Sequence, residues 1–178
     1  MRKLLNEELK RLSLDEFKVQ EKIPLIIVLD NIRSMHNIGS VFRTSDAFLV
    51  QKVYLCGITA TPPHSEIHKT ALGSTDSVEW KYFEHTTDAV KELKENRVCI
   101  VGIEQTENSI LLNDFHPETG ITYAYVFGHE VRGVSQKVIN DCDIAIEVPQ
   151  FGTKHSLNIS VCAGILIWDF YSKLRLTK

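Results

Sequence analysis

Short apolar runs alternate with helix-forming stretches along nearly the whole chain. Continuous apolar runs, clearest at Leu25–Leu29 and Val98–Ile103, are typical of strands buried on both faces of a sheet. Between such runs, apolar residues recur at helical spacing, as in 38–49 and 87–96. This alternation predicts an α/β fold with a mostly parallel sheet and helices on both of its faces.

The pattern predicts the bounds of the individual elements. We expect strands over Leu25–Leu29, Val53–Leu55, Val78–Phe83, Val98–Ile103, Tyr123–Phe127 and Ile144–Val148. We expect helices over 1–22, Ile38–Leu49, Glu66–Leu72, Thr87–Asn96, Ser135–Asn140 and from about Ser156 to about Leu174. No repeat or linker divides the chain, so we expect an N-terminal helical extension at 1–22 and one domain at 23–178. The extension packs on the domain edge in our interpretation, although an RNA-facing surface or a dimer contact is an alternative.

Composition narrows the class of protein. The chain has 178 residues and a net charge of −3, which argues against coating nucleic acid by bulk charge. None of the four cysteines forms a CxxC pair, so reduced thiols of a cytoplasmic protein are the simplest interpretation. The N-terminus alternates charge and leucine, so we expect no signal peptide. The longest apolar stretch, Val161–Trp168, is too short to span a bilayer.

The stretch Ile144–Phe170 predicts the location of a ligand site. A buried strand is followed by a polar loop and then by an apolar helix. Ser156 and Asn158 lie where the loop enters the helix, and either can cap free backbone N–H groups there. Open α/β sheets usually bind ligands in such loops, at the carboxyl ends of their strands.

A second polar stretch, Asn31–Ala47, follows the first strand. Asn37 and Gly39 lie near the start of a helix, where unpaired N–H groups attract anions. Arg43 lies six residues after Asn37, beside an apolar helix face. Its guanidinium either pairs with a structural carboxylate or points into a site, and this stretch alone leaves both interpretations open.

A third polar stretch, Phe127–Ser135, follows another strand. Gly128 and Gly133 flank Glu130, and glycines let the backbone approach a ligand closely. The spacing matches neither the dinucleotide fingerprint nor a phosphate loop. Alone, Glu130 is most simply interpreted as a cap or as a partner of Arg132.

Together, in this order and spacing, the three stretches resemble the three motifs of the SpoU (TrmH-type) branch of the SPOUT methyltransferase superfamily. The resemblance extends from about Pro24 to Phe170, nearly the whole chain. It implies an α/β fold with a C-terminal trefoil knot. Knots are so rare in proteins that reasoning from the sequence pattern alone would not propose one. The resemblance also implies S-adenosyl-L-methionine as methyl donor, no metal, a homodimer, and methylation of a ribose 2′-hydroxyl in tRNA or rRNA.

The resemblance assigns roles to individual positions. Residues that match the polar site of the family, with Arg43 at the position of its proposed catalytic arginine, are Arg43, Asn37, Glu130, Ser156 and Asn158. Residues that match donor-holding positions, largely through backbone groups, are Ile103, Gly128, Gly133, Val148 and Leu157. We expect the three loops to converge in one pocket next to the guanidinium of Arg43.

The implied reaction is in-line attack of a ribose oxygen on a sulfonium methyl, so catalysis depends on alignment. Arg43 is too basic to accept the proton, and we expect it to steady the developing alkoxide or to grip a phosphate. Nothing in the chain resembles an appended RNA-binding segment, so RNA is expected to bind the core surface modestly, with an affinity that falls with salt. Candidate contacts are Arg33, Lys69, Arg132, Lys154 and the basic N-terminal residues.

Two other functions stay open at this point. The chain could be a donor-binding RNA module without catalysis, which a methyl-transfer assay with bulk RNA would reveal. It could instead be an unrelated small-molecule enzyme on an open α/β sheet, which donor binding or a knotted C-terminus would exclude.

Overall fold

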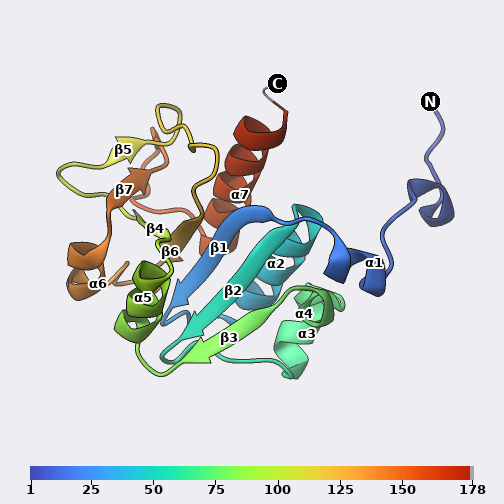
Figure 1. Cartoon of the computed structure of the whole chain (residues 1–178), viewed down its shortest axis with the longest axis horizontal. Coiled ribbons are helices and arrows are strands. Elements are labelled where there is room, and N and C mark those ends of the chain that lie inside the picture. The colour runs from blue at the N-terminus through green and yellow to red at the C-terminus, as the bar shows by residue number, and fades with distance from the viewer. Residues whose placement is uncertain (177–178) are drawn as a thin grey trace.

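The computed structural model describes residues 1–176 and contains one seven-stranded sheet within them (Figure 1). All neighbouring strands are parallel, in the order β3-β2-β1-β6-β4-β7-β5. The strands are β1 (Ile23–Asp30), β2 (Val50–Cys56), β3 (Trp80–Phe83), β4 (Cys99–Ile103), β5 (Ile110–Leu111), β6 (Tyr123–Phe127) and β7 (Ile144–Glu147). The predicted α/β class is confirmed. The strand that the sequence missed, β5, has two residues, too few for a hydrophobic pattern.

Helices cover both faces of the sheet. They are the 3₁₀ turn η1 (Asn6–Leu9) and the helices α1 (Leu14–Val19), α2 (Met35–Ala47), α3 (Ser65–Ala71), α4 (Ser74–Ser77), α5 (Thr86–Glu95), α6 (Gln136–Asp141) and α7 (Ile159–Arg175). Leu25, Ile27 and Leu29 of β1 belong to the core that includes α2, α3 and α7. Ile26 and Val28 belong to a second core with α5 and α6. Successive side chains of a strand point to opposite faces, so an unbroken apolar run is what this double burial requires.

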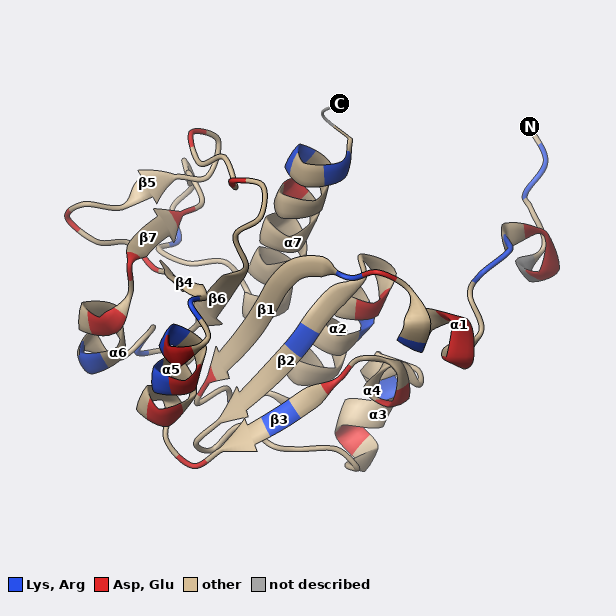
Figure 2. Cartoon of the chain, in the orientation of Figure 1, with Lys and Arg blue, Asp and Glu red and all other residues tan. Residues whose placement is uncertain are grey.

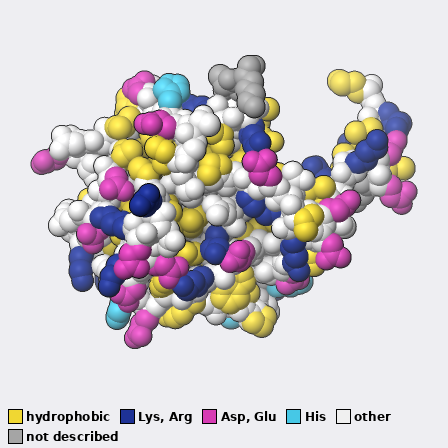
Figure 3. Space-filling model, viewed as in Figure 1, with side chains coloured by type: hydrophobic (Ala, Val, Ile, Leu, Met, Phe, Trp, Pro, Cys, Tyr) yellow, Lys and Arg dark blue, Asp and Glu magenta, His cyan; other side chains and the backbone are white. Residues whose placement is uncertain are grey.

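The predicted helix over residues 1–22 is wrong. The structure has the short elements η1 and α1 instead, separated by Lys10 in a left-handed conformation. Of the side chains described in this segment, only Phe17 is buried, whereas Leu4 and Leu5 are 60% and 64% exposed. Isolated helices need a packed face to be stable, and these leucines lack one. Packing on the domain edge therefore holds for α1 alone, and the first residues extend away from the domain (Figures 1 and 3).

Helix α7 begins later than the sequence suggested. Its predicted start was about Ser156, but its first residue is Ile159. The Oδ1 atom of Asn158 accepts hydrogen bonds from the amides of Ser160 and Val161, at 2.9 and 3.4 Å, and so caps the helix. The short helix α4 was not predicted, and the last two residues of the predicted domain, 177–178, lie outside the described residues.

Figure 2 marks Lys and Arg in blue and Asp and Glu in red on the ribbon, and the two colours are interspersed along the strands and helices. Two of the lysines there, Lys52 on β2 and Lys81 on β3, pair with Glu79 and Glu92 at 2.6 and 2.5 Å. Among residues 1–176, no helix combines the length and hydrophobicity that a bilayer crossing requires. The positive charges of Lys52 and Lys81 are therefore largely compensated, which makes these two lysines weak candidates for contacts with nucleic acid.

Candidate functional site

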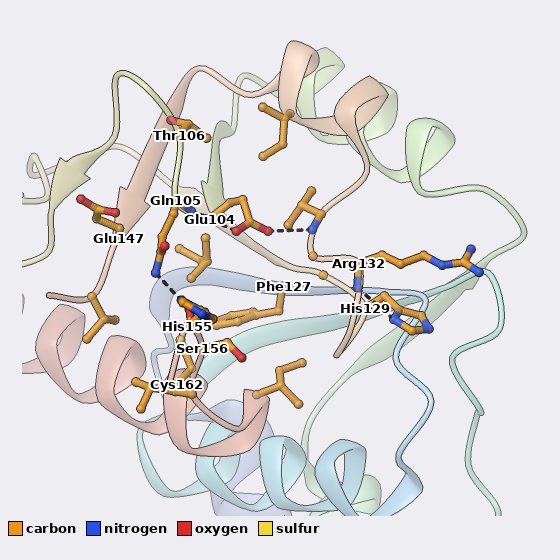
Figure 4. Close-up of a pocket in the computed structure, with 18 of the residues that line it drawn as sticks. Glu104, Gln105, Thr106, Phe127, His129, Arg132, Glu147, His155, Ser156 and Cys162 are labelled. Carbon is orange, nitrogen blue, oxygen red and sulfur yellow. Dashed lines mark hydrogen bonds between the residues drawn. The ribbon is translucent and has the colours of Figure 1, made fainter. Parts of the chain in front are cut away.

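A cavity of about 1160 Å³ lies beyond the carboxyl ends of β4, β6 and β7 (Figure 4). Its lining comes from three segments that follow these strands, within 103–108, 127–139 and 146–162. This is the edge where parallel sheets bind ligands. Eight of the ten predicted site residues line the cavity: Ile103, Gly128, Glu130, Gly133, Val148, Ser156, Leu157 and Asn158.

Glu130 joins the cavity to the start of α2. Its carboxylate accepts hydrogen bonds from the backbone amides of Ser34 at 2.9 Å and Arg33 at 3.1 Å, and from the Nδ2 group of Asn37 at 3.5 Å. Burial alone would raise the pKa of Glu130, but the amides of Ser34 and Arg33 outweigh it and hold the pKa below its ordinary value. The sequence had left two interpretations open, a cap or a partner of Arg132; the partners found are at the start of α2, and Arg132 is not among them.

Asn37 and Asn158 connect this contact to α7. The Nδ2 group of Asn158 donates to Oδ1 of Asn37 at 3.2 Å, while Oδ1 of Asn158 caps α7. Asn37 is only 9% exposed and lies behind the cavity lining. Polar residues from all three predicted stretches thus form one hydrogen-bonded chain, as expected for a single site.

Arg43 is the exception. Its side chain is exposed and is not among the residues that line the cavity. Within residues 1–176 its guanidinium makes no hydrogen bond or ion pair, so the structural carboxylate considered for it is not found. Helix α2 begins near the cavity and rises 1.5 Å per residue, which carries Arg43 about 9 Å along the axis from Asn37. The expectation that a single chain brings the guanidinium into this pocket is therefore not met.

The loop after β6 folds back tightly on itself. The backbones of His129 and Gly133 exchange two hydrogen bonds, at 3.1 and 2.8 Å. A Cβ atom on Gly128 would lie 2.0 Å from the amide nitrogen of Val134, and Gly133 has a φ of +66°. Gly128 has no room for a side chain on this path, Gly133 takes a conformation that favours glycine, and the path places Glu130 within reach of α2.

Sequence reasoning missed Glu104 and Gln105. Oε2 of Glu104 accepts from the amide of Val134 at 3.0 Å, and Nε2 of Gln105 donates to the carbonyl of His155 at 3.3 Å (Figure 4). They follow Ile103, a predicted donor contact, so their place just past a strand end was the available signal. Their partners, 30 and 50 residues away, had no signal in the sequence.

The walls are mixed in chemistry. Apolar side chains such as Ile103, Val148 and Leu157 stand beside backbone groups of the three loops. Cys162 also lines the cavity, and burial, with a smaller effect of Glu104, raises the pKa of its thiol to about 11. In the described part of the chain, no three His, Cys, Asp or Glu side chains are grouped to hold a metal ion. The cavity is suited to an organic ligand that has apolar surface and also groups that form hydrogen bonds.

The chain belongs to the SpoU rRNA Methylase family, whose model matches residues 24–168. The 23S rRNA (guanosine-2′-O-)-methyltransferase RlmB of Neisseria meningitidis serogroup B is 31% identical over 144 residues, covering 81% of this chain and 56% of the relative. RlmB of Nitrosomonas europaea is 31% identical over 151 residues, covering 83% and 55%. The chain thus spans a little over half the length of these curated relatives.

Solved structures agree with this membership. The TrmH/SpoU tRNA modifying enzyme of A. aeolicus matches with a TM-score of 0.79 and 25% identity, over 94% of this chain and 82% of that one. The SpoU methyltransferase AviRb of Streptomyces viridochromogenes, solved with its cofactor AdoMet, matches with a TM-score of 0.78 and 22% identity, over 93% and 66%. The latter similarity shows the fold alone. The family predicted from the three motifs is confirmed.

Proposed function

We propose that this chain transfers a methyl group from S-adenosyl-L-methionine to a ribose 2′-hydroxyl of tRNA or rRNA. The observation that carries the proposal is the cavity in a chain of the SpoU family. Hydrogen bonds of Glu130, Asn37 and Asn158 connect this cavity to the starts of α2 and α7. The names of the relatives support it, since RlmB is a guanosine 2′-O-methyltransferase and AviRb was solved with AdoMet. A cytoplasmic location, where tRNA and rRNA are available, is part of the proposal.

The cavity suits the methyl donor. Gly128 and Gly133 line the cavity and have no side chains, so backbone groups of their loop are accessible to a ligand there. Ile103, Val148 and Leu157 provide apolar surface for a nucleoside. When bound, the donor supplies an electrophilic methyl group on a sulfonium. The chain's own part is to hold it and to exclude water from the reacting face.

The polar residues align the acceptor in this proposal. Glu130 fixes the start of α2 and the side chain of Asn37, while Asn158 fixes the start of α7 beside Ser156. A ribose hydroxyl held between these two helix starts would be oriented for in-line attack. Arg43 would steady the developing alkoxide or an adjacent phosphate.

A homodimer would bring Arg43 to a cavity. Helix α7 presents an apolar stripe in which Val161, Ile165 and Trp168 are 52%, 38% and 49% exposed. Trp168 also contacts Phe48 at the end of α2, with ring centroids 5.5 Å apart. Two copies that pair through this α2–α7 face would cover the stripe and present the guanidinium of one copy to the cavity of the other.

The knot is proposed for the C-terminal third of the chain. Strand β7 lies between β4 and β5, and the amide of Leu112 donates to the carbonyl of Glu147 at 2.9 Å. On α7, Lys173 donates to the carbonyls of Leu112 and Phe115, both at 2.7 Å. Segment 104–122 thus contacts the chain both before and after it enters α7, which supports a threaded path.

RNA would approach at the cavity rim. Arg132 lines the cavity, Arg33 adjoins the Glu130 contact, and Lys154 is exposed in the loop before α7. Lys69 pairs with Glu66 at 2.6 Å and so contributes less positive charge. With few free cations, we expect RNA affinity to be modest and to fall with salt.

Transfer of a tritiated methyl group to total RNA, followed by nucleoside mapping, tests the proposed function. We expect label in a 2′-O-methylated nucleoside. Donor binding without transfer to any RNA would support the alternative of a non-catalytic donor-binding RNA module. Label on a base instead of a ribose would contradict the assigned reaction.

A further inference from the structure

The loop between β6 and α6, residues 128–135, is held by carboxylates at two places, near its tip and at its base next to α6. Near its tip, Glu130 accepts from two amides at the start of α2. At its base, Oε2 of Glu104 accepts from the amide of Val134 at 3.0 Å, and Oδ2 of Asp30 accepts from the next amide, that of Ser135, at 3.4 Å. Charge-assisted hydrogen bonds therefore attach the loop to three other segments of the chain.

Glu104 and Asp30 differ in what they hold. Asp30 is 2% exposed, and its Oδ1 atom accepts from Thr86 and Asn31 at 2.5 and 2.7 Å, so it belongs to the interior of the fold. Glu104 lines the cavity, and its Oε1 atom accepts from the amide of Gln105 at 3.0 Å. One carboxylate thus fastens the loop after β6 to the loop after β4, and these are two of the three cavity walls (Figure 4).

The fit around Glu104 is close. A Cβ atom on Gly133 would lie 2.0 Å from Oε2 of Glu104. A side chain at this position would push the carboxylate away from the amide of Val134. Gly133, which sequence reasoning assigned to the donor, therefore also makes room for the Glu104 contact.

We propose that Glu104 is a positioning residue that sets the affinity for the methyl donor. It holds the base of the Gly128–Val134 wall so that Glu130, near the tip of the loop, reaches α2. Without Glu104, Asp30 still holds Ser135, but the loop loses one of its contacts and has more conformations to lose when a ligand binds, which weakens binding. This inference rests on the proposed function and adds a residue to it that the motifs do not contain.

The substitution Glu104→Gln tests the contact with little change in shape. Its amide keeps one acceptor oxygen, but its NH₂ group faces one of the two backbone donors, so one hydrogen bond is lost. We expect donor binding, measured by calorimetry, to weaken roughly tenfold while the melting temperature changes little. The matched control is Glu95→Gln, an exposed carboxylate on α5, which should leave both values unchanged.

A double-mutant cycle with Glu130→Gln gives a readout that a purely structural role would not move. If both carboxylates hold one loop, releasing the second contact matters less once the first is lost. We therefore expect the combined loss of affinity to be smaller than the product of the two single losses. Losses that multiply fully would overturn the proposal, because they would mean that the two contacts act independently.

Amide hydrogen exchange, measured by NMR without donor, separates this inference from the proposed function. In Glu104→Gln we expect faster exchange at Val134, Gln105 or both. If exchange rises but the variant binds donor like wild type, Glu104 is not a positioning residue. Unchanged exchange at both amides would equally overturn the proposal. If wild type binds no donor, the proposed function fails, and the positioning role for the donor fails with it, while the exchange data still report whether the contact exists.

Discussion

Two positions on helix α2, its first turn and Arg43, are held very differently. Its first turn is fastened by Glu130, which accepts from two backbone amides and from Asn37, and Asn37 is in turn bonded to Asn158. Two turns later, Arg43 is exposed and makes no hydrogen bond or ion pair with any described residue. The cavity and the contacts of Glu130, Asn37 and Asn158 therefore lie within one chain, whereas Arg43 does not reach that cavity. Under the proposed function, Arg43 would act only once a second molecule, either another copy or the RNA, is bound.

Removing Arg43 gives the largest expected effect. In Arg43→Ala we expect methyl transfer to fall about a thousandfold, because an electrostatic group at the reacting oxygen is lost. Donor binding should stay within about twofold, since Arg43 does not line the cavity. Transfer is measured with tritiated donor and bulk RNA, and binding by calorimetry. If donor binding were lost together with transfer, Arg43 would also be needed to hold the donor, and the contrast between Arg43 and the first turn of α2 would not stand.

Mixed dimers sharpen the comparison. We combine Arg43→Ala with Gly128→Val, whose side chain would collide with the backbone at Val134 and so distort this wall of the cavity. Each variant alone should be inactive. If Arg43 serves the cavity of the other copy, mixing them should restore roughly a quarter of wild-type activity, because half of the dimers are mixed and each has one complete site. No recovery in dimers shown to have exchanged would mean that Arg43 acts within its own chain.

Removing the Glu130 carboxylate, which contacts the start of α2, should have a smaller effect. Glu130→Gln keeps the shape of the side chain but replaces one acceptor oxygen with a donor, which faces a backbone N–H group. We expect donor affinity to fall roughly tenfold and the melting temperature to fall slightly. Calorimetry and thermal unfolding measure the two. An unchanged affinity would show that the start of α2 does not depend on this carboxylate.

Acid pH should weaken the same contact. Because the pKa of Glu130 is lower in the folded chain, its charge stabilises the fold above the ordinary glutamate pKa of about 4.3. That contribution disappears as pH falls from there through the lowered folded value. We expect the free energy of unfolding, measured by denaturant titration, to fall less over this acid range in Glu130→Gln than in wild type. An equal fall in both would mean that the carboxylate gains nothing from Ser34 and Arg33.

The sequence was sufficient for six of the seven strands and for much of the cavity. An apolar run such as Leu25–Leu29 has one simple explanation, a strand with both faces buried, and the glycines around Glu130 mark a loop just past a strand. Glu104 could not be found in this way. Its contact with Val134 depends on the order of β4 and β6 in the sheet, which hydrophobic periodicity does not contain.

The N-terminal segment and Arg43 show a second limit. Leucines at helical spacing in residues 1–22 predicted a packed helix, yet periodicity does not say whether a partner surface exists, and here one is found for Phe17 alone among the described side chains. The spacing from Asn37 to Arg43 likewise placed both on one helix. Where that helix leads relative to the cavity is a property of the three-dimensional fold.

The central claim is that the cavity at the carboxyl ends of β4, β6 and β7 holds the methyl donor. Calorimetric titration of S-adenosyl-L-methionine into wild type and into folded Gly128→Val tests it most directly. The account predicts saturable binding of one donor per chain in wild type and none in the variant. No binding in wild type at millimolar donor, or equal binding in both proteins, would contradict it.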